Sequence, residues 1–115
     1  MKQLLTTLFF ASFFITTLNA QSPTWVWAES AEGNYYEDAT SVASDIPGNI
    51  YVTGYFAGST VIFGNDTLNN AGVSDIYLLK YDIFGNYDWA IPFGGTAEDY
   101  GNSVTCDLNG NVYVT

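Results

Sequence analysis

Short runs of apolar and aromatic residues, separated by glycine, asparagine and aspartate, extend over most of the chain. Their alternation predicts β-strands at residues 41–44, 49–56, 75–81 and 87–93. In residues 50–52 and 76–81 both alternating faces are apolar or aromatic, which predicts a sheet covered on both sides. Residues 57–68 predict a short extra hairpin that turns at residues 64–66. Because no run after Ala20 has a 3.6-residue period, we expect almost no helix.

The N-terminal segment, residues 1–20, has a different pattern. Lys2 gives a positive start, residues 4–18 are apolar apart from threonine and serine, and Ala20 precedes Gln21. This layout is typical of a secretory signal peptide that is cut after Ala20. A membrane anchor is the alternative, but the apolar run is shorter than the ~20 residues that span a bilayer. We therefore predict that residues 1–20 are a signal peptide and that the protein is secreted or displayed at the cell surface.

The rest of the chain contains an internal repeat. Residues 27–53 and 89–115 agree at 11 of 27 positions when they are aligned without gaps. The matches include Trp27 with Trp89 and the run 45–53 with the run 107–115, all at one constant offset in the numbering. Self-similarity at a fixed period is the signature of a repeat architecture.

One turn motif, Asp-x-x-Gly-Asn, recurs three times and starts at Asp45, Asp82 and Asp107. The aspartate carboxylate can accept a backbone N–H two residues further on and so close an Asx-turn. The glycine can adopt the positive φ that a hairpin with a bulge requires. Because the motif occurs in each turn of one type, we interpret these aspartates as structural rather than catalytic.

Short strands in a small sheet, buried on both faces and repeated in tandem, predict the blades of a β-propeller. The spaced residues of the repeat resemble the SBBP β-propeller repeat of secreted bacterial proteins. The residues that carry this resemblance are Trp27, Gly33, Asp45, Gly48–Asn49, Tyr51–Phe56, Phe63–Gly64, Gly72, Asp75–Leu78, Lys80–Asp82, Gly85–Asn86 and Trp89, followed by Phe93–Gly95, Glu98–Val104 and Asp107. The resemblance implies an all-β propeller fold and an exported location, but no single activity. We expect about one and a half blades of antiparallel sheet, with a first repeat at residues 21–89 and the start of a second at residues 90–115.

A closed propeller has ~4–8 blades, whereas the sequence holds one full repeat and only the first part of another. Thr115 corresponds to Thr53, whose predicted strand continues to Phe56. A sheet that stopped there would leave backbone groups unpaired. We therefore expect an N-terminal piece of a longer protein, whose remaining blades are partners of this one. The alternative is a small protein whose copies assemble blade to blade.

Composition excludes several classes of function. The chain has no histidine, so neither a Ser-His-Asp nor a Cys-His relay can form, and zinc and non-haem iron lose their commonest ligand. The formal charge of −10 argues against nucleic acid, and no phosphate-binding glycine motif occurs. Without the leader, Lys80 is the only basic side chain and the formal charge is −11. The single cysteine, Cys106, allows no intrachain disulfide and is interpreted as a small buried residue.

Two pairs of adjacent acids, Glu37–Asp38 and Glu98–Asp99, are candidates for calcium binding or for glycosidase chemistry. We favour the interpretation that they are loop acids or turn caps, because adjacent positions do not fix a distance between two carboxylates. The sequence at Asn65 fits a glycosylation acceptor, but the resemblance to a bacterial repeat leads us to expect no glycan there.

Aromatic residues are the other candidates, because their faces can stack on sugar rings. Trp27 and Trp89 recur at the repeat period and are predicted to be blade core. Trp25 and the pair Tyr35–Tyr36 are not repeated and are the better candidates for binding.

These observations predict an exported repeat protein whose propeller is a scaffold or binding module for a surface glycan or a protein. We assign no catalytic, cofactor-binding or metal-binding residue and expect no catalysis in this segment. One alternative is a polysaccharide-acting enzyme with carboxylates from several blades, in which replacing Glu98 or Asp99 would abolish activity. Another is a passive spacer joined to a C-terminal sorting or adhesion module.

Overall fold

The computed structural model describes residues 26–115, and the predicted signal peptide and Trp25 lie outside these residues. Within that range the chain forms nine β-strands and no helix, as the sequence predicts. Residues 26–115 accordingly contain no helix long and apolar enough to cross a membrane.

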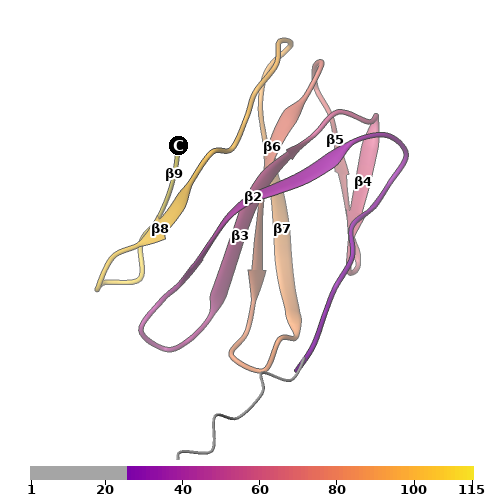
Figure 1. Cartoon of the computed structure of the whole chain (residues 1–115). Helices are drawn as coiled ribbons and strands as arrows, with labels where there is room; N and C mark the ends of the chain where they lie inside the picture. Colours follow the sequence, from indigo (N-terminus) through magenta and orange to yellow (C-terminus); the bar gives the residue numbers. More distant parts are fainter. Residues whose placement is uncertain (1–25) are drawn as a thin grey trace, which may run out of the picture.

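Four strands form the main antiparallel sheet, in which each strand pairs with the next along the sheet (Figure 1). They are β2 (Glu37–Ser44), β3 (Ile50–Phe56), β6 (Asp75–Tyr81) and β7 (Tyr87–Phe93). Three of them coincide closely with the predicted strands. The first begins earlier than predicted, because a register shift between Ala39 and Ser41 lets it continue to pair with β3 as far as Glu37.

The predicted extra hairpin is confirmed as β4 (Thr60–Phe63) and β5 (Asp66–Asn69), which turn at Gly64 with a φ of 54°. The short strand β1 (Glu32–Gly33) pairs with β4 and completes a second sheet of three strands. This hairpin covers one face of the main sheet, where its apolar residues join the larger core. That core consists of Phe56, Val61, Phe63, Leu68, Tyr77, Leu79, Tyr81 and Ala90.

The predicted internal repeat is confirmed in the strand register. β8 (Val104–Cys106) pairs with β9 (Val112–Val114) as an antiparallel hairpin. In this hairpin Val104 is the cross-strand partner of Val114, and in the first repeat Val42 of β2 is the partner of Val52 of β3. The two pairs occupy equivalent positions, because they are separated by the same offset in the numbering as Trp27 and Trp89. The second hairpin lies beside the main sheet (Figure 1), and Val104 packs with Tyr51 and Leu78 in a separate core. The central strands β3 and β6 are thus covered on both faces, as the apolar pattern of residues 50–52 and 76–81 predicts.

The two repeated tryptophans have unequal surroundings. Trp89 lies in β7 and packs against the smaller core, with its ring centroid 6.3 Å from that of Tyr51. Trp27 lies outside any strand, is 36% exposed and covers Tyr81 at a centroid distance of 5.1 Å. The prediction that both belong to the blade core therefore holds for Trp89 but only in part for Trp27. Trp27 precedes the first strand of residues 26–115 and lies in none of the sheets described for this range.

Candidate functional site

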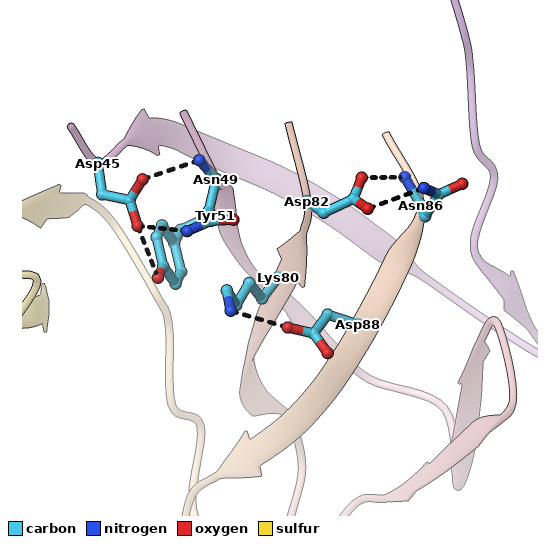
Figure 2. Close-up of polar contacts among 7 residues, drawn as sticks. All are labelled: Asp45, Asn49, Tyr51, Lys80, Asp82, Asn86 and Asp88. Atoms are coloured by element: carbon cyan, nitrogen blue, oxygen red, sulfur yellow. Dashed lines mark hydrogen bonds and ion pairs between the residues drawn. The ribbon is translucent and has the colours of Figure 1, made fainter. Parts of the chain in front are cut away.

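The turn end of the sheet is built around the three repeated aspartates. Asp45 Oδ1 accepts hydrogen bonds from the backbone N–H groups of Gly48 and Asn49 at 2.9 and 2.8 Å. Its Oδ2 accepts from Asn49 Nδ2 at 2.8 Å and from the Tyr51 hydroxyl at 3.2 Å (Figure 2). Both carboxylate oxygens are thereby engaged in holding the turn, as the structural interpretation predicts. The backbone donors lie three and four residues further on rather than two, because the residue two positions on is Pro47, which has no N–H.

The same arrangement recurs in the other two turns. Asp82 accepts from the backbone N–H and the side-chain amide of Asn86, and Asp107 does so from Asn111. The glycines of the three motifs have φ values of 95°, 83° and 83°, as the sequence predicts. The pKa of each of the three aspartates is lowered, mainly because an asparagine side chain donates a hydrogen bond to its carboxylate. The pKa of Asp107 falls to about 2.

This pKa shift predicts a pH dependence of stability. A carboxyl group whose pKa is lower in the folded state than in the unfolded state stabilises the fold at pH values above the unfolded pKa of ~3.9. This stabilisation is lost as the pH falls toward the pKa of the folded state. The variant Asp107→Asn lacks the charged acceptor. It should melt at a lower temperature than the parent chain at pH 6, and the difference should narrow between pH 4 and pH 2. Thermal unfolding followed by circular dichroism measures this gap, and a gap that is constant over this range would contradict the role of the charge.

The same end of the sheet holds Lys80, the only basic side chain of residues 26–115. Its ammonium group lies 2.8 Å from Asp88 Oδ2 on the neighbouring strand (Figure 2). The hydrogen bond with Asp88 raises the pKa of Lys80. The described part of the chain therefore offers no free cationic side chain with which to bind phosphate or another anion.

The opposite end of the sheet has a groove lined by tyrosines, with a volume of about 410 Å³. We call it the tyrosine groove, and its lining residues are Tyr35, Tyr36, Tyr55, Ala57, Val73, Ser74, Glu98 and Tyr100. They come from the loop before β2, the end of β3, the loop before β6 and the connection from β7 to β8. Tyr35 is 80% exposed, Tyr36 52% and Tyr100 42%. The groove is therefore an open aromatic surface rather than an enclosed cavity.

Three of the tyrosine rings form a continuous row. The ring centroid of Tyr55 lies 4.6 Å from that of Tyr100, edge to face at 84°, and 5.9 Å from that of Tyr36. A side-chain hydrogen bond with Tyr36 is the main cause that raises the pKa of Tyr55 to about 12. Because a tyrosine hydroxyl is neutral near pH 7, the row presents aromatic faces and uncharged hydroxyl groups to a ligand.

Backbone hydrogen bonds hold the walls of the tyrosine groove in place. The N–H of Ala57 donates to the carbonyl of Tyr36 at 2.9 Å, which ties the loop before β2 to the end of β3. On the other wall, the Asp99 N–H donates to the carbonyl of Ser74 at 2.9 Å, and Glu98 forms a parallel bridge with Ser74. The aromatic row is therefore supported by the sheet and is not carried by a free loop.

The two predicted acidic pairs have different surroundings in the structure. Glu37 and Asp38 lie in β2 and not in a loop, which corrects the prediction, because the register shift lengthens this strand. Asp99 Oδ2 accepts the Gly95 N–H at 2.8 Å and so caps a turn, whereas Glu98 lines the tyrosine groove. Residues 26–115 contain no group of three or more acids and cysteines placed to share a metal ion.

Cys106 and Asn65, which the sequence analysis also singles out, lie away from the tyrosine groove. Cys106 is half-buried in β8 beside the smaller core, and burial raises the pKa of its thiol. Asn65 lies exposed in the turn between β4 and β5. Neither residue contributes to the tyrosine groove.

Sequence reasoning finds Tyr35 and Tyr36 but misses Tyr55 and Tyr100. The pattern places Tyr55 in a strand, but it does not show which strand end faces a loop cluster. Tyr100 does leave a signal: at the repeat offset it aligns with Asp38, so an aromatic residue appears where the first copy has an acid. Sequence reasoning places Asp75 in a strand but does not show that its side chain is buried and accepts the Ala71 N–H at 2.8 Å.

A four-stranded antiparallel meander whose first hairpin recurs further along the chain is the architecture of β-propeller blades. Residues 88–115 match the family model of the SBBP β-propeller repeat. Over these residues the match agrees with the resemblance seen in the sequence.

A curated relative is similar to a larger part of the chain. It is an uncharacterized WD repeat-containing protein of Acanthamoeba polyphaga mimivirus, 30% identical over 95 residues. The similarity covers 77% of this chain but only 7% of the relative. The name of this relative describes a repeat protein, and the match extends the similarity beyond residues 88–115.

Proposed function

We propose that this chain is a non-catalytic binding part of an exported β-propeller protein and that the tyrosine groove binds a surface glycan. The single observation that carries the proposal is the aromatic row of Tyr36, Tyr55 and Tyr100 at the loop end of the sheet. Tyrosine supplies a large, rigid contact surface with a hydroxyl group, and it loses little conformational entropy on binding.

The size of the tyrosine groove favours a glycan over a folded protein partner. A groove of about 410 Å³ lies within the ~300–1,000 Å³ that is usual for small-ligand sites. A stable protein interface takes ~20–30 residues from each partner, many more than line the tyrosine groove. A sugar chain of a few units fills an open groove of this kind.

The surroundings of the acids support a role without catalysis in residues 26–115. The carboxylates of Asp45, Asp82, Asp99 and Asp107 accept turn N–H groups. Glycoside hydrolysis needs a pair of carboxyl groups on the two sides of a scissile bond, and Glu98 is the only acid that lines the tyrosine groove. The signal-peptide pattern of residues 1–20 supports export.

The variant Tyr100→Ala tests this proposal. The whole protein is titrated by calorimetry with three tetrasaccharides: cellotetraose, the N-acetylglucosamine tetramer and the glucosamine tetramer. We expect saturable binding of at least one of them, weakened about tenfold or more by Tyr100→Ala, because truncating an aromatic residue that carries binding energy costs ~1–2 kcal/mol or more.

The matched control is Phe84→Ala, which removes an aromatic side chain that is 79% exposed in a turn at the other end of the sheet. It should leave binding unchanged. If none of the three sugars binds, or if both variants weaken binding equally, the tyrosine groove is not a glycan site.

A further inference from the structure

The tyrosine groove is aromatic and also negatively charged. Glu98 lies in its wall with an exposed side chain, and no hydrogen bond or ion pair of this carboxylate is found among residues 26–115. Asp38 is the cross-strand partner of Tyr55 in β2, so the two side chains project from the same face of the sheet. A ligand in the groove is therefore exposed to the negative charge of Glu98 in its wall and of Asp38 beside Tyr55.

No positive charge of the described residues offsets this field. Lys80 forms an ion pair with Asp88 at the turn end of the sheet. Its distance from the tyrosine groove follows from β6, in which Lys80 lies four residues from Ile76, the cross-strand partner of Tyr55. At ~3.3 Å per residue this is about 13 Å, longer than the ~8 Å screening length at physiological salt. An acidic sugar would be repelled from the tyrosine groove, whereas a cationic one would be attracted.

We propose that the tyrosine groove selects glycans that carry free, protonated amino groups. In this arrangement the sugar rings lie against the row of Tyr36, Tyr55 and Tyr100, and one ammonium group pairs with the Glu98 carboxylate. The same ammonium group is attracted by the negative faces of the tyrosine rings. This inference rests on the proposed function, because it names the class of sugar that the same groove binds.

The test compares two ligands that differ in one chemical group. The whole protein is titrated at pH 6 with the glucosamine tetramer, whose amines are protonated, and with the neutral N-acetylglucosamine tetramer. An exposed ion pair and an exposed cation–π contact together give a preference on the order of tenfold for the glucosamine tetramer. Raising the salt concentration from 20 to 300 mM should reduce this preference, because exposed charges are screened.

The variant Glu98→Gln separates a specific contact from the attraction of the whole acidic chain. It should reduce the preference to about threefold or less, because it weakens binding of the glucosamine tetramer more than binding of the N-acetylglucosamine tetramer. The matched control Glu29→Gln removes the same charge at the groove beside Trp27 and Tyr81, and it should keep most of the preference.

The outcomes for the two proposals are distinct. Equal affinity for the two tetramers, both weakened by Tyr100→Ala, would overturn the selectivity and leave the glycan site standing. Equal loss of preference in Glu98→Gln and Glu29→Gln would also overturn it, because the attraction would then come from net charge alone. Absence of binding to every sugar would remove both proposals together.

Discussion

Replacing Phe56 with alanine is expected to lower the free energy of unfolding by about 3–5 kcal/mol, the usual cost of removing a buried phenylalanine side chain. Phe56 is fully buried at the end of β3 and belongs to the core shared by the main sheet and the β4–β5 hairpin. Its loss would leave a cavity between the two sheets. A small domain has only ~5–15 kcal/mol of stability, so much of the margin would be lost.

Urea unfolding followed by circular dichroism measures this effect as a shift of the midpoint at constant slope. Phe84→Ala is the matched control, because the same atoms are removed from a side chain that is 79% exposed; its effect should be within ~0.5 kcal/mol. A change below about 1 kcal/mol in Phe56→Ala would mean that the hairpin does not pack on the sheet as described.

Replacing Gly54 with alanine is the second large change, with an expected loss of about 2–6 kcal/mol in the free energy of unfolding. A Cβ atom at this position would lie 1.8 Å from the carbonyl oxygen of Asp38 and 2.6 Å from the Tyr77 hydroxyl. That hydroxyl donates a hydrogen bond of 2.9 Å to the same carbonyl, and Tyr77 is buried. The methyl group would force β2 away from β3. The loss combines overpacking, at ~1–3 kcal/mol, with a buried hydroxyl left without its partner, at ~1–3 kcal/mol.

Gly95→Ala is the control for this substitution, because the nearest atom to its added Cβ is 3.9 Å away. The two variants make the same chemical change, and only Gly54→Ala should lower the unfolding midpoint in urea. The displacement of β2 would also move Tyr36 relative to Tyr55, so Gly54→Ala should weaken any glycan binding that the folded parent has. Equal stability of the two variants would contradict the close approach of β2 and β3.

Local patterns predict the strands and turns of this chain because those features depend on near neighbours in the sequence. The Asp-x-x-Gly-Asn motif contains both the acceptor and the flexible residue of its turn, so the structural role predicted for Asp45, Asp82 and Asp107 is confirmed. The register of β8 with β9 follows from the repeat for the same reason. The predicted start of β2 is wrong because the register shift after Ala39 depends on pairing with β3.

The sequence by itself determined the all-β class, the internal repeat, the hairpin insertion and the structural role of the turn aspartates. Only the tertiary structure brought Tyr36, Tyr55 and Tyr100 into one row, because they come from three segments that meet at the loop end of the sheet. It likewise decided that Glu98 lines the tyrosine groove while its neighbour Asp99 caps a turn. Periodicity shows which residues alternate along a strand, but the pairing of distant strands decides which loops become neighbours.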